Sequence, residues 1–143
     1  MNLYKLLTIT FLITALWDVA LRIMSENYYS LPKFLQYDFI RYLRPYFKKH
    51  TILSAALIAG IVGAVTQVII LKFVDIPKKI MSYKTVEFVV ISFIISALIG
   101  FPMKWSGLFP HLYEYYYKPL GDIRGAYHDG ISGVIVQSTL LLL

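Results

Sequence analysis

The feature that most constrains this chain is an uncharged, mostly apolar run from Thr51 to Leu71. An α-helix rises about 1.5 Å per residue, so a run of 21 residues is long enough to cross the roughly 30 Å hydrocarbon core of a bilayer. Inside that core every backbone polar group needs a partner within the protein, and a helix supplies those partners by itself. The run therefore predicts a membrane-spanning helix over residues 51–71.

Three further segments extend this prediction to about four transmembrane helices. They cover residues 3–24, residues 86–101, where Pro102 is expected to stop the helix, and residues 120–143. The first is expected to be a retained span, because no small-x-small cleavage site of a signal peptide follows it. The last has a polar first half and becomes apolar only from Ile131, so its helix starts either near residue 120 or much later. We predict an all-α, polytopic membrane protein in which residues 1–143 form a single membrane domain.

The composition supports a membrane location and excludes several kinds of chemistry. Of the 143 residues, 58% are hydrophobic and 15% are charged, whereas an average soluble domain has about 25% charged residues. A chain this small has too much surface for its volume to hide that excess from water. The net charge is +6. The basic residues behind it are expected to lie mostly between the spans and to contact anionic lipid, and we expect no nucleic-acid partner. The absence of cysteine excludes disulfides and thiolate catalysis, and we expect no enzyme activity and no cofactor.

Residues 31–48 combine apolar and basic side chains at helical spacing. This pattern is typical of an amphipathic helix that lies in the lipid headgroup plane, although a cytosolic helix packed on a partner is the alternative. Pro45 is expected to kink or end it. The apolar face would carry Leu31, Leu35, Phe39, Tyr42 and Tyr46. The side chains assigned to anionic headgroups are Lys33, Arg41, Arg44, Lys48 and Lys49.

Small residues recur at every fourth position in the second and third spans. The row in the second span is Ala56, Gly60 and Ala64, and the row in the third is Ser92, Ser96 and Gly100. Such rows let two helices approach closely where no hydrophobic effect drives them together. We therefore expect these two rows to pack against each other in an antiparallel pair.

Several ionisable residues fall near one side of the predicted membrane. Four spans place both termini and the loop at 72–84 on one side, and the polar layer would lie toward the other. Its members are Asp18, Arg22, Asp122, Arg124, His128 and Asp129. Charged groups inside a membrane are costly and are candidates for function. Asp18 and Arg22 are four residues apart and are expected to pair on one helix face.

Three interpretations of this layer compete. The favoured one is a structural network in which the two arginines pair with the aspartates. The second is the lining of a path for ions or small molecules. The third is a metal site made of His111, Glu114, His128 and Asp129, but these residues lack a diagnostic zinc spacing and we expect no metal.

The segment at 102–119 is rich in tyrosine and tryptophan, which favours an interfacial loop. Together these patterns predict a non-enzymatic, multi-spanning protein with a structural or scaffolding role in a cellular, organellar or viral membrane. Its partners would be the lipid bilayer and either copies of itself or another membrane protein. The alternative is an oligomeric channel or transporter that uses Asp18, Arg22, Arg124, His128 and Asp129.

Overall fold

The computed structural model describes residues 2–79, 81–107, 118 and 121–143. These residues form helices and connecting segments, and none of them is in a strand. Two short 3-10 turns lie at Tyr28–Ser30 and Lys33–Leu35. The helices are α1 (Leu3–Glu26), α2 (Asp38–Lys49), α3 (Ile52–Phe73), α4 (Tyr83–Ser106) and α7 (Asp122–Leu142). Helices α1, α3 and α4 are long and apolar enough to cross a membrane, so the prediction of an all-α membrane protein is confirmed.

Local sequence sets several of the helix ends. The side chain of Asn2 accepts a hydrogen bond from the backbone N–H of Lys5 at 2.8 Å and so caps α1. The hydroxyl of Thr51 accepts one from the backbone N–H of Ser54 at 3.1 Å and caps α3. Both satisfy an N–H that the first helical turn leaves without a partner. Helix α4 ends at Gly107, whose φ of 70° suits a residue without a Cβ.

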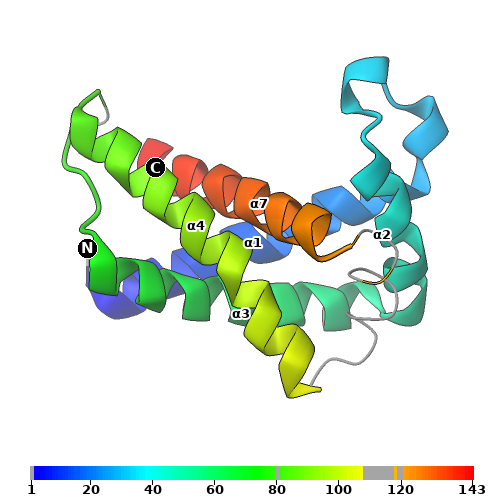
Figure 1. Ribbon diagram of the computed structural model, residues 1–143, viewed down its shortest axis with the longest axis horizontal. Coiled ribbons are helices and arrows are strands. Elements are labelled where there is room, and N and C mark those ends of the chain that lie inside the picture. The colour runs from blue at the N-terminus through cyan, green and yellow to red at the C-terminus, as the bar shows by residue number, and fades with distance from the viewer. Residues whose placement is uncertain (1, 80, 108–117, 119–120) are drawn as a thin grey trace.

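The four long helices form one bundle, with both chain termini at one end and α2 at the other (Figure 1). The most extensive contacts join α1 to α3 and α4 to α7. Smaller contacts join α1 to α7 and α3 to α4, and α2 packs on α1. The fold is therefore built from two helix pairs, α1–α3 and α4–α7, that meet along a common boundary.

Glycines form the closest contacts within each pair. A Cβ placed on Gly60 of α3 would lie 2.7 Å from the ring of Phe11 on α1, and one on Gly63 would overlap the side chain of Thr14. We call this contact the α1–α3 seam. At Gly63 the approach is so close that the smallest residue is required, whereas at Gly60 the close contact is with the outer atoms of the Phe11 ring.

The second pair has an equivalent contact, which we call the α4–α7 seam. A Cβ on Gly130 of α7 would lie 2.7 Å from the ring of Phe93 on α4. A Cβ on Gly133 would overlap the side chain of Ser96.

The predicted packing of the second span against the third is therefore wrong. Gly60 faces α1 and Ser96 faces α7, while the contact between α3 and α4 is small. Ala56 and Ala64 are only half-buried. A row of small residues indicates that some helix comes close, but it does not identify which one. The rows concerned are Ala56, Gly60 and Ala64 on α3 and Ser92, Ser96 and Gly100 on α4.

The predicted helix over residues 31–48 is only partly present, because α2 begins at Asp38. The residues before it form the two 3-10 turns on either side of Pro32, since proline disfavours helical backbone in the residue that precedes it. Pro45 lies inside α2, so of the two expected effects, a kink or an end, it does not cause the end; Pro102 lies inside α4 and does not stop that helix as expected. A proline removes one backbone hydrogen bond, and in these two helices the remaining bonds suffice.

One side of α2 packs into the bundle. Leu43, Tyr46 and Phe47 are buried and form a cluster with Leu21 of α1 and Ala55 of α3. The basic side chains of this region are exposed, namely Lys33, Arg41, Arg44, Lys48 and Lys49.

The last helix, α7, includes the polar stretch that precedes Ile131, so it begins near residue 120 rather than late. It is not among the helices that are apolar enough to cross a membrane, and four spans are thus reduced to three plus α7. In the segment at 102–119, residues 102–106 belong to α4, which contradicts a loop there. Residues 108–117 and 119–120 lie outside the described residues.

Candidate functional site

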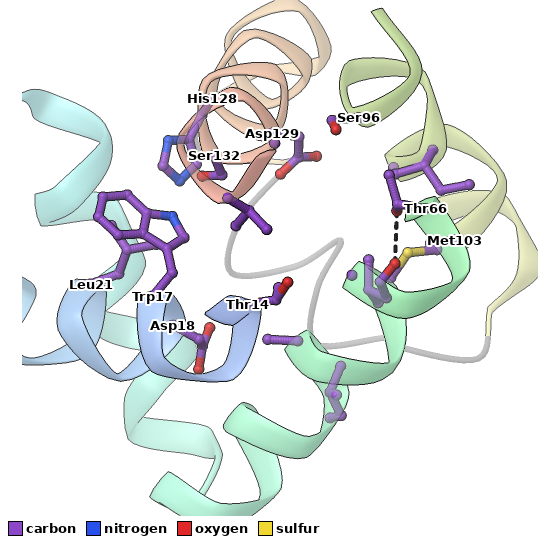
Figure 2. A pocket seen from close by; sticks show the side chains of 18 of the residues that line it. Thr14, Trp17, Asp18, Leu21, Thr66, Ser96, Met103, His128, Asp129 and Ser132 are labelled. Atoms are coloured by element: carbon purple, nitrogen blue, oxygen red, sulfur yellow. Dashed lines mark hydrogen bonds between the residues drawn. The ribbon is translucent and has the colours of Figure 1, made fainter. Parts of the chain in front are cut away.

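A cavity of about 180 Å³, partly open to the outside, lies between the helices, and all five helices contribute to its lining (Figure 2). A well-studied apolar cavity of about 150 Å³ holds a benzene molecule, whereas sites for drug-sized ligands have about 300–1,000 Å³. This cavity is therefore matched to one small solute or a few water molecules.

Three of the predicted polar residues line the cavity. Asp18 reaches it from α1, and His128 and Asp129 reach it from α7. Figure 2 shows Asp18 on one side of the space and the two α7 residues on the other. Burying such groups between apolar helices costs free energy. In the described structure three of these costly groups lie together around the cavity.

The helical repeat of α7 explains why its polar groups face the same space. His128 and Ser132 are four residues apart, and so are Asp129, Gly133 and Gln137. Residues at this spacing share one helix face, and all five line the cavity. Outside this stripe, Ile123 and Tyr127 are exposed.

Arg22 does not form the predicted pair with Asp18. Its Nη1 donates a hydrogen bond to the backbone carbonyl of His50 at 2.9 Å, and its Nε lies 3.4 Å from Oε1 of Glu26. The guanidinium also sits 5.8 Å from the ring centroid of Phe47. Glu26 is four residues further along, so it is as close a helical neighbour as Asp18. The long side chain turns toward the helix end and ties α1 to the junction of α2 and α3.

Asp122 and Arg124 also lie outside the cavity lining. Asp122 is bound by Nζ of Lys104 at 2.5 Å, which joins the end of α4 to the start of α7, and Arg124 is exposed. Lys104 was missed because Pro102 was expected to end the helix before it.

Tyr46 closes the α2 end of the cavity beside Asp18. Burial raises the pKa of its phenol above the ordinary value, and the negative charge of Asp18 raises it further. The phenol therefore keeps its proton and remains a hydrogen-bond donor.

A chain of buried hydrogen bonds lies on the other side of the cavity. Nε2 of Gln137 donates to Oε1 of Gln67 at 2.5 Å, and the hydroxyl of Thr10 lies 3.4 Å from the same oxygen. All three residues are buried and come from α7, α3 and α1. The two glutamines are isolated polar residues in apolar runs, and that pattern was available in the sequence.

The helical register divides the interior into three layers that follow one another at intervals of one turn. The cavity layer is Thr14, Gly63, Ser96 and Gly133. The amide layer is Thr10, Gln67, Ser92 and Gln137, all buried. The apolar layer is Leu6, Ile70, Phe88 and Leu140, also buried. Toward the chain termini the interior thus changes from polar to apolar within two turns of each helix.

The described residues contain no group of three or more His, Asp or Glu side chains arranged to hold a metal ion. His111 and Glu114, which belonged to the possible metal site, lie outside them.

Comparison with known proteins adds no relative to this picture. No protein-family model matches the chain, and searches of curated proteins and of solved structures give no match.

Proposed function

We propose that this membrane protein binds a small polar solute in the cavity and carries it across the membrane. The observation that supports this proposal is the set of ionisable side chains, Asp18, His128 and Asp129, around an internal space. A bundle with only a structural role gains most from a close-packed apolar interior. Ionisable groups that line a space inside a membrane are typical of solute and ion pathways.

Two features would narrow a path through this cavity. At one end Leu43, Tyr46 and Phe47 of α2 line the cavity. At the other end the apolar layer follows the amide layer within one helical turn. Apolar constrictions are a common way to close a conducting path, because water does not fill them.

A structural or scaffolding role is the second candidate. The exposed basic residues of the α2 region favour it, since Arg44 and Lys48 are suited to contact anionic headgroups. Assembly with copies of the chain or with another membrane protein is an expectation shared by both candidates.

Flux into liposomes that contain the purified protein separates these candidates. Potassium, ammonium, chloride and urea are offered in turn, and at least one is expected to enter faster than in protein-free liposomes. Asp129→Asn is expected to slow this flux, while Glu87→Gln, which neutralises an exposed carboxylate of α4, leaves it unchanged. If none of the solutes enters faster, transport is rejected and scaffolding becomes the leading function.

A further inference from the structure

Building on the proposed function, we propose that the solute is a small monovalent cation. It would be bound by oxygen atoms at the inner end of the cavity, which is the end next to the amide layer and away from α2. Four side chains supply these oxygens, one from each long helix. They are Thr14 of α1, Thr66 of α3, Ser96 of α4 and Gln137 of α7, and all four line the cavity. Figure 2 shows Thr14, Thr66 and Ser96 around the same space.

The two threonines present lone pairs to this space. Oγ1 of Thr14 donates to the backbone carbonyl of Thr10 at 2.7 Å, and Oγ1 of Thr66 donates to that of Val62 at 2.7 Å. A hydroxyl carries one proton and two lone pairs. With the proton committed to a carbonyl, each hydroxyl can only accept.

Ser96 and Gln137 contribute oxygens that have no hydrogen-bond partner among the residues the structure describes. Their exposed fractions are 4% and 2%, so bulk water does not satisfy them. A buried polar oxygen without a partner is costly, and a bound cation would engage the lone pairs of both oxygens.

Gln67 acts as a positioning residue for this site. Its Oε1 accepts the hydrogen bond from Nε2 of Gln137, so the amide N–H group of Gln137 is directed away and the remaining oxygen is the acceptor of that side chain.

Charge decides between a cation and other solutes. The side chains of Asp18 and Asp129 line the same cavity, and their acidic oxygens suit a cation better than an anion. The donors Trp17 and Tyr46 lie toward the α2 end beside Asp18, whereas the hydroxyls of Thr14 and Thr66 can only accept. A divalent transition metal is not favoured, because the described residues lack a suitable group of His and carboxylate ligands. Alkali ions and ammonium share the chemistry that four oxygens recognise, since each is small and carries a single positive charge.

Thermal unfolding in detergent tests the site through binding. Sodium, potassium and ammonium chloride are compared with N-methylglucamine chloride, whose cation is too bulky, at equal ionic strength. At least one small cation is expected to raise the unfolding temperature, because a ligand that binds only the folded state stabilises it. Ser96→Ala and Gln137→Leu are expected to raise the cation concentration needed by about tenfold or more, the loss expected when a hydrogen-bonding or ligand oxygen to a charge is removed.

Matched variants keep the test informative. Thr139→Val removes an exposed hydroxyl of α7 and is expected to leave the response unchanged. Gln137→Glu keeps an oxygen at the site and adds negative charge, so it is expected to lower the cation concentration needed, even if Gln137→Leu fails to fold.

Flux measurements distinguish failure of this proposal from failure of transport itself. Liposomes that admit urea or chloride but no small cation would retain the transport function and overturn the cation proposal. Equal stabilisation by N-methylglucamine would also overturn it. If no solute enters and no cation stabilises the protein, both proposals are rejected.

Discussion

Replacement of Gly63 by alanine places a methyl group where α3 lies closest to α1. The new Cβ would overlap Oγ1, Cβ and Cγ2 of Thr14, atoms too near the backbone to move without displacing α1. Overpacking of this kind costs about 1–3 kcal/mol, while alanine regains about 1 kcal/mol of helix propensity over glycine. Because Thr14 cannot move aside, we expect the cost at the upper end of this range and a net loss of stability of about 2 kcal/mol.

Gly60→Ala provides an internal comparison on the same helix. Its Cβ would lie 2.7 Å from the outer atoms of the Phe11 ring. A ring end can rotate away, so the overpacking cost is close to the propensity gain, and the net change is expected to be near zero.

Unfolding by sodium dodecyl sulfate in mixed micelles, followed by circular dichroism, measures both variants. Val65→Ile on the exposed side of α3, where 49% of Val65 is accessible, adds a methylene without a close neighbour and serves as the control. If Gly63→Ala unfolds at the same detergent fraction as Val65→Ile, the close approach of α1 and α3 is refuted.

Three further predictions address other parts of the bundle. Arg22→Lys is expected to loosen α2, because lysine lacks the planar group that reaches the His50 carbonyl; faster hydrogen exchange at 38–50 would show this, and unchanged exchange would contradict it. Tyr46 has a folded-state pKa above its unfolded value of 10.0, so the unfolded chain loses this proton first and stability falls as the pH rises above about 10; pH-dependent unfolding checks the sign, and a rise in stability would oppose it. Leu140→Ala is expected to increase solute leak through liposomes and to destabilise the protein, whereas Leu142→Ala is expected to do neither, because these side chains are 6% and 77% exposed; equal leak would argue against the apolar layer as a barrier.

The class of fold was predictable because it depends on properties that each segment has alone. A run such as 51–71 is apolar enough to cross a bilayer whatever its neighbours are. Helix ends were less predictable where proline was involved. Pro45 and Pro102 both lie within helices, since a proline removes one backbone hydrogen bond and the remaining bonds suffice.

The sequence did not predict which side chain pairs with which, or which helix packs against which. Arg22 had two acidic neighbours at equal spacing, and the one nearer the helix end, Glu26, forms the pair. The small residues of α3 indicated that another helix lies close, but they did not identify that helix as α1. In the candidate site, Asp18 and Asp129 were anticipated as polar groups inside the membrane. Thr14 and Thr66 were not, because a threonine in an apolar run looks neutral until its hydroxyl is seen to bond to its own helix.

The two glycine seams have a mechanical consequence. Each seam holds two helices close together, so we expect α1–α3 and α4–α7 to move as two units. The contacts between the two helix pairs are smaller than those within each pair. The cavity is lined from both sides of this boundary. Sliding or rocking of one helix pair against the other would change the volume and the openings of the cavity while both seams stay intact. Motion between the two pairs would therefore act at the place where a solute would bind.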